Sequence, residues 1–203
     1  MVDTKAISMD AIKELRDETG VAVMQCKKAL EDAGGDMEKA RMMLRKKSGE
    51  LAAKKGDRTL AAGVVQVYLH GNNSVAAMVE LSCETDFVAK NEEFKHLAYE
   101  IAMHVAASNP KYRTEADISD EDKKKAKEFF AEEVEKTMAG KPEAIKAKAL
   151  EGKMDTYFKE LVLVQQPFIK NPDITVGDMI KGAVQKFGEN TELTRYARFA
   201  VGK

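Results

Sequence analysis

The chain has 203 residues, of which 33% are charged, and its formal net charge at pH 7 is -1. This length can bury a core in one domain or in a small domain joined to a medium one, and the interspersed charges give no field that would attract a nucleic acid. Because no apolar run approaches the roughly 20 residues of a membrane span, and the two cysteines form no CxxC pair, we expect a soluble, cytoplasmic protein without structural zinc.

Three short helices are predicted at the N-terminus. Ser8 is placed to cap the first helix, and Thr19-Gly20 ends it. A stripe of small residues marks the second helix, which stops at Gly34-Gly35. The third helix begins at Asp36 and is predicted to end at Ser48-Gly49.

We assign these helices to a module at residues 1–52, followed by a linker at residues 53–58. The stretch "LAAKKGDR" loses the helical periodicity and carries three cations around one glycine. A unit of this size is only marginally stable by itself. The sequence therefore predicts a tethered module joined to a core at residues 59–203.

The core begins with a β-hairpin signal. Apolar and polar residues alternate over residues 65–70 and again over residues 75–83, and the two runs are separated by "GNN". A helix is predicted next. Asn91 is placed to cap it, and Asn109-Pro110 ends it.

Two highly charged helices are predicted after this helix. Ser119 opens the first, and Lys141-Pro142 opens the second, which Gly152 is expected to interrupt. Since only "AGKP" separates them, we expect an antiparallel helical hairpin at about residues 119–164 that projects from the core.

The C-terminal part is predicted to contain one more helix and one more strand. Thr175 and Asp178 have the spacing of a reciprocal capping pair. The run "ELTRYARFAV" predicts an edge strand with Leu193 and Phe199 on one side, although Arg195 falls on the same side. The fold class that follows is α+β, with a three-stranded antiparallel sheet.

The stretch "CETDFVAKN" joins the second predicted strand to the helix after it. Because Asn91 caps that helix, Thr85, Asp86 and Phe87 are left as a short exposed connector. An aromatic ring can enter an apolar pocket of a partner, while the neighbouring acid competes for a cation or a hydrogen-bond donor. The pair is also compatible with a simpler structural role, in which Phe87 is a core residue and Asp86 a cap.

Residues that would support catalysis are scarce. Cys26 and Cys83 are in phase with apolar neighbours, which is typical of buried, inert thiols. The histidines, at positions 70, 96 and 104, are dispersed, and no phosphate-binding glycine motif occurs. We therefore expect a protein that is not an enzyme and that holds no cofactor and no metal.

Four ordered segments together resemble the bacterial elongation factor Ts family. "LRDETGVAVMQCKKALEDAGGDMEKA" is similar to the N-terminal signature of that family, and "ETDFVAKNEEF" is similar to its second signature. "QPFIKNPDITVGDMI" and "RYARF" resemble its C-terminal part. The resemblance spans almost the whole chain, and its length matches the short members of the family.

The resemblance implies a guanine-nucleotide exchange factor for the GTPase elongation factor Tu. It also implies that the N-terminal module is ubiquitin-associated-like. In the family the Asp-Phe pair acts near the magnesium and nucleotide site of the GTPase, which carries over to Asp86 and Phe87, with Thr85 and Val88 beside them. The helical module contacts the same GTPase, and the matching positions are Arg16, Val23 and Met24. Nucleic acid and membrane are not implied as partners.

The chain departs from the family pattern at a few positions, among them Val23, where methionine is usual, and Gln25, where an acid is usual. The residues alone leave two other functions open: an adaptor whose core is only a scaffold, and a cysteine-dependent enzyme. The last strand, expected at a sheet edge, leaves homodimerisation open, and the resemblance implies the same possibility, since short family members pair.

Overall fold

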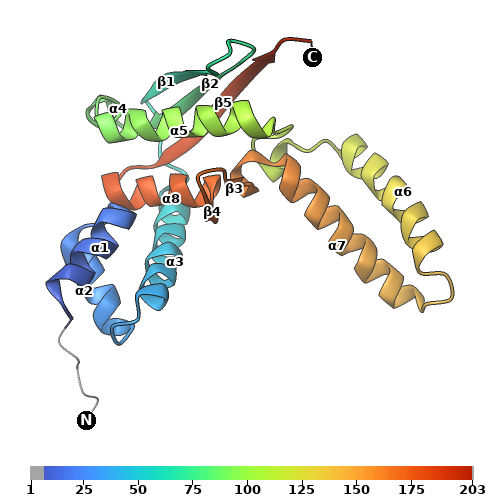
Figure 1. The fold of residues 1–203 in the computed structure, drawn as a ribbon, viewed down its shortest axis with the longest axis horizontal. Helices are drawn as coiled ribbons and strands as arrows, with labels where there is room; N and C mark the ends of the chain where they lie inside the picture. Colours follow the sequence, from blue (N-terminus) through green and yellow to red (C-terminus); the bar gives the residue numbers. More distant parts are fainter. Residues whose placement is uncertain (1–6, 203) are drawn as a thin grey trace.

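The α+β class is confirmed by the computed structural model, which describes residues 7–202. The molecule has three regions: an N-terminal helical module, a core with a sheet, and a projecting helical hairpin (Figure 1). The elements in chain order are α1 (Met9–Thr19), α2 (Val23–Asp32), α3 (Met37–Lys55), β1 (Ala62–Leu69), β2 (Val75–Cys83), α4 (Asp86–Ala89), α5 (Glu92–Ser108), α6 (Asp120–Thr137), α7 (Glu143–Leu161), β3 (Pro167–Phe168), β4 (Asn171–Thr175), α8 (Val176–Phe187) and β5 (Thr191–Ala200).

The first and third helices begin where the capping signals predicted. The Ser8 hydroxyl accepts a hydrogen bond from the backbone N–H of Ala11, and the Asp36 carboxylate accepts one from Lys39. Gly20 ends α1 with φ 66°, a left-handed conformation that favours glycine. The helices enclose their own apolar cluster, which includes Leu15, Cys26, Leu30, Ala40 and Leu44.

The predicted end of the third helix at Ser48-Gly49 is wrong, because α3 continues to Lys55. The Ser48 hydroxyl donates to Leu44 O in the preceding turn and to the Gln185 side chain of α8. Gln185 in turn donates to Gln25 Oε1 at 2.7 Å. This contact with α8 keeps the helix intact past two weak helix formers, so the first part of the expected linker is helical and the module is packed against the core.

The sheet has the order β1-β2-β5, and both pairs are antiparallel, as predicted. Helix α5 covers one face of the sheet, and α8 lies on the other side of α5 (Figure 1). Phe94 of α5 is fully buried and meets Phe187 of α8 edge to face, with ring centroids 5.6 Å apart. The core is therefore a stack of sheet, α5 and α8.

The predicted placement of Leu193 and Phe199 on one side of the last strand is wrong. The register shifts between Glu80 and Leu81, so that Thr194 is an extra residue in β5. Such a bulge reverses the alternation. Leu193 therefore points into the core, whereas Phe199 and Arg195 point away from it, and Arg195 forms an ion pair with Glu80.

One face of the sheet is uncovered and apolar. On β1 the side chains of Val64 and Tyr68 face the core beneath the sheet, whereas those of Val65, Val67 and Leu69 point outward. We call this surface the outer sheet face, and its large exposed side chains are Val65, Val67, Leu69, Met78 and Phe199.

Helices α6 and α7 form the predicted antiparallel hairpin and project away from the core (Figure 1). Cross-helix ion pairs join them, among them Lys153 with Glu133 at 2.8 Å and Lys146 with Glu135 at 2.8 Å. The expected interruption at Gly152 is wrong, because α7 is continuous there. Between α7 and α8 the chain forms a small sheet of β3 and β4, which was not predicted.

Candidate functional site

The segment expected to be an exposed connector is a single turn of helix, α4. Thr85 occupies its N-cap position, and Asp86 and Phe87 form its first two residues. The Phe87 side chain is 82% exposed, which is unusual for a ring that a structural role would bury. The alternative in which Phe87 is a core residue is therefore excluded by the structure.

Val88 and Ala89 form the inner side of the same turn. Val88 is only 3% exposed and belongs to the core cluster beneath the sheet. The sequence predicts a direct contact between Val88 and a partner, and this burial leaves little of the side chain accessible for one. The side chain instead anchors the turn whose other face presents Phe87.

Asp86 is exposed and charged. Lys90 Nζ donates to its Oδ2 at 2.5 Å, one helical turn away. This hydrogen bond, together with the charge of Lys90, holds the pKa of Asp86 below its usual value. The carboxylate is therefore ionised at neutral pH, and its present cation partner is an exposed side chain that can be exchanged at little cost.

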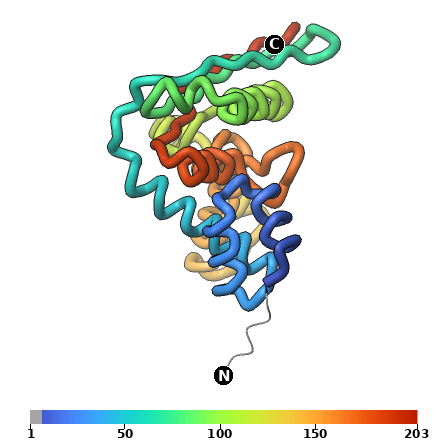
Figure 2. The backbone as a smooth tube through the Cα atoms, turned by 90° about the vertical axis from the view of Figure 1, so that its left-hand side faces the viewer, coloured from blue at the N-terminus to red at the C-terminus, as the bar shows by residue number. Residues whose placement is uncertain are grey.

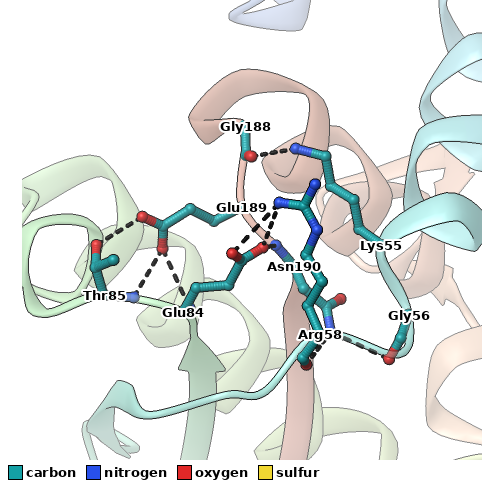
Figure 3. A network of polar contacts seen from close by, with 8 residues as sticks. All are labelled: Lys55, Gly56, Arg58, Glu84, Thr85, Gly188, Glu189 and Asn190. Carbon is teal, nitrogen blue, oxygen red and sulfur yellow. Dashed lines mark hydrogen bonds and ion pairs between the residues drawn. The ribbon is translucent and has the colours of Figure 1, made fainter.

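A network of polar contacts lies behind the turn (Figure 3). The Glu189 carboxylate accepts hydrogen bonds from the Thr85 N–H and hydroxyl, and the Glu84 carboxylate accepts one from the Asn190 N–H. Sequence reasoning missed Glu84, Glu189 and Asn190, because their partners are about a hundred residues away and no local pattern marks them.

The other predicted contact residues lie on either side of the turn between α1 and α2. Arg16 is exposed in the last turn of α1, and Val23 and Met24 open α2. Met24 is 72% exposed. Helices α1, α2 and α4 all lie on the side of the molecule that faces the viewer in Figure 2.

The thiols and His104 fit structural roles. Cys26 and Cys83 are buried, and burial raises the pKa of each thiol, which disfavours the reactive thiolate. His104 is also buried, and burial lowers its pKa. Its Nε2 lies 2.9 Å from Gln166 Oε1, while its Nδ1 accepts from the Ile169 N–H, so a neutral ring satisfies both contacts.

Within residues 7–202, His, Cys, Asp and Glu side chains nowhere gather in a group of three or more that could hold a metal ion. In the same residues, no helix combines the length and the apolar character that crossing a membrane requires.

Comparisons with known proteins cover nearly the whole chain. The model of the family described as "Elongation factor TS" matches residues 5–203. Elongation factor Ts of Carboxydothermus hydrogenoformans is 45% identical over 197 residues, covering 97% of this chain and 90% of the relative. Elongation factor Ts of Thermosipho melanesiensis is also 45% identical over 197 residues, covering 97% of this chain and all of the relative, 100%. Elongation factor Ts of Herpetosiphon aurantiacus is 42% identical over 197 residues, covering 97% and 98%.

Proposed function

The chain belongs to the elongation factor Ts family, and from this premise we propose that it is the guanine-nucleotide exchange factor of elongation factor Tu in the cytoplasm. It binds the GDP form of the GTPase, promotes GDP release by disturbing the magnesium and phosphate site, and stays bound to the nucleotide-free GTPase until GTP rebinds. The observation that carries this proposal is the exposed Phe87 ring beside the charged Asp86 on an anchored turn.

The physical task is negative coupling between two ligands of one GTPase. Weakening nucleotide binding by about 100-fold requires a coupling free energy of roughly 3 kcal/mol, and linkage requires the nucleotide to weaken binding of the factor equally. The factor must therefore make contacts that the nucleotide-free GTPase accepts and the nucleotide-bound GTPase does not. No covalent chemistry and no cofactor are needed.

Asp86 and Phe87 divide this task. The Phe87 ring wedges into a packed contact of the GTPase and shifts the backbone that holds the phosphates. The Asp86 carboxylate leaves Lys90 and competes for the water and ligand network of Mg²⁺. Because Mg²⁺ neutralises the phosphates, losing it lowers nucleotide affinity.

The helical module supplies a second contact through Arg16, Val23 and Met24. Since α3 is packed along α8 through Ser48 and Gln185, the module is held in one orientation relative to α4. A partner then pays less ordering entropy than it would for a module on a flexible tether. This favours simultaneous binding at both surfaces.

Stopped-flow release of a fluorescent GDP analogue from elongation factor Tu of the same organism tests the function. We expect the intact protein to accelerate release strongly and the Asp86→Ala, Phe87→Ala double variant to lose that acceleration. If the intact protein leaves the release rate unchanged, the proposed exchange function is wrong, and the alternative of an adaptor whose core is only a scaffold is favoured instead.

We further propose that the outer sheet face pairs two copies of the chain. Two sheets pack face to face through apolar side chains about 10 Å apart, and a twofold arrangement lets one patch cover itself. The ion pair of Glu80 and Arg195 borders this patch and is self-complementary under the same symmetry.

Phe199→Glu should convert the resulting dimer to a monomer, because two like charges would then face an apolar contact. Sedimentation velocity over a wide range of protein concentrations measures this. Phe129→Glu, on the exposed side of α6, is the matched control and should stay dimeric. A parent protein that sediments as a monomer at every concentration rules out the pairing.

A further inference from the structure

Thr85, the residue before Asp86, is held at every polar atom, and Figure 3 shows its contacts with Glu189. Its N–H donates to Glu189 Oε2 at 3.0 Å, and its hydroxyl donates to Glu189 Oε1 at 2.6 Å. Its carbonyl oxygen accepts from the Cys83 thiol at 3.2 Å and from the Ala89 N–H at 3.2 Å. Glu189 also accepts from the Glu84 N–H at 3.1 Å, so one carboxylate takes three of these hydrogen bonds.

The turn that carries Glu189 is itself fixed on both sides. Before it, Lys55 donates to the Gly188 carbonyl oxygen. After it, the Asn190 N–H donates to Glu84 Oε1 at 2.6 Å, and the Asn190 side chain donates to Gly56 O and Arg58 O. The carboxylate is therefore presented to Thr85 from a support that joins the end of α3 to the start of β5.

Helix α4 needs such a support because it cannot set its own direction. It has four residues, and isolated helices of that length are not stable in water. The Thr85 side chain makes no capping bond to α4, because its hydroxyl is engaged by Glu189. The direction of the turn therefore depends on what holds its N-cap residue Thr85, together with the burial of Val88.

We propose that Glu189 is a positioning residue for nucleotide exchange, whose carboxylate fixes Thr85 and thereby the direction in which Asp86 and Phe87 project toward the partner. This inference rests on the proposed function of Asp86 and Phe87. Glu189 does not contact the GTPase itself. It acts by reducing the number of orientations that α4 would otherwise sample before binding.

Glu189→Ala tests the proposal in the full chain. A displacement of about 1 Å in a positioned group can reduce a rate on the order of 100-fold. Because the Cys83 thiol and the buried Val88 still hold the turn, we expect GDP release at saturating factor to slow by about 10-fold. Affinity for nucleotide-free elongation factor Tu, measured by calorimetry, should change far less, since the module contact is intact.

Two further variants separate positioning from general stability. Glu189→Gln should recover most of the rate, because the amide oxygen still accepts from both N–H groups and the amide nitrogen can donate to the Thr85 hydroxyl oxygen. Thr85→Val, which removes only the hydroxyl contact, should be intermediate. Glu192→Ala is the matched control, since this nearby carboxylate binds Arg113 and not the turn, and it should exchange at the parental rate.

The decisive measurement is a double-mutant cycle of Glu189→Ala with Phe87→Ala. If Glu189 acts by directing Asp86 and Phe87, its substitution should slow release clearly less once the Phe87 ring is absent, because only Asp86 is then left to be directed. Equal slowing in both backgrounds, or a parental rate for Glu189→Ala, overturns the positioning role alone. A parental rate for Phe87→Ala would instead overturn both the proposed role of Phe87 in nucleotide release and the positioning role of Glu189.

Discussion

Phe87→Ala should slow GDP release from elongation factor Tu at saturating factor by about 100-fold, while complex formation is largely preserved. The ring is 82% exposed in the free protein, so its removal costs the fold little. In the proposed mechanism, the ring makes its contact only when the phosphate-binding backbone of the partner is displaced. Such a contact contributes to the transition state for release and not to the initial encounter, so the rate falls and the affinity for the nucleotide-bound form does not.

Stopped-flow release over a range of factor concentrations measures both quantities, because the plateau reports release from the complex and the midpoint reports binding. Phe129→Ala is the control, since Phe129 is a comparably exposed ring at 67% but lies on the hairpin. If Phe87→Ala reached the parental plateau, the wedge would be rejected.

Met24→Ala is expected to weaken binding to nucleotide-free elongation factor Tu by about 30-fold, which corresponds to roughly 2 kcal/mol for a central contact side chain. Met24 is 72% exposed at the start of α2, beside Val23 and across the turn from Arg16. Because we propose that this surface only holds the two proteins together, the plateau rate of GDP release should remain at the parental value once the factor is in excess.

Titration calorimetry with the nucleotide-free GTPase gives the affinity. Met42→Ala is the matched control, because Met42 is 61% exposed in the same module but lies on α3. Equal affinities for the Met24 and Met42 variants would mean that the surface around Met24 does not contact the GTPase. A lower plateau for Met24→Ala would mean that the module takes part in release itself.

The two variants should each change a different quantity of the GDP-release curve. Phe87→Ala should change the plateau, and Met24→Ala should change the midpoint. This separation follows from the structure, where α4 contacts β1, β2 and α5, whereas the helical module packs on α8 through α3. A single undivided contact surface would give both variants the same mixture of effects.

Signals within a few residues of one another were sufficient to predict most of the elements. Capping residues such as Ser8, Asp36 and Ser119 mark helix starts because their side chains bind N–H groups only two or three positions ahead. The capping box of Thr175 and Asp178 is equally local and is present. The alternation of apolar and polar residues predicts the antiparallel sheet. Asp86 and Phe87 stand out because an acid and a large aromatic residue are unusual in a short connection between a strand and a helix.

Contacts between distant residues decided the rest. Ser48 stays helical because Gln185 is beside it, and Thr194 is an extra residue only in relation to β2. Alternation on β1 is the same whichever face is buried, so only the packing of α5 shows that Val65 and Val67 point outward.

The sequence by itself therefore determined which residues could act on a partner, because Asp86 and Phe87 are chemically conspicuous in their own neighbourhood. Only the tertiary structure decided the direction in which their side chains project. Glu189, which accepts the hydrogen bond from the Thr85 N–H, is 104 residues away in the chain. In the sequence, Glu189 looks like any solvent-exposed carboxylate in a turn. It can bind Thr85 only after folding has brought the end of β2 next to the α8–β5 turn.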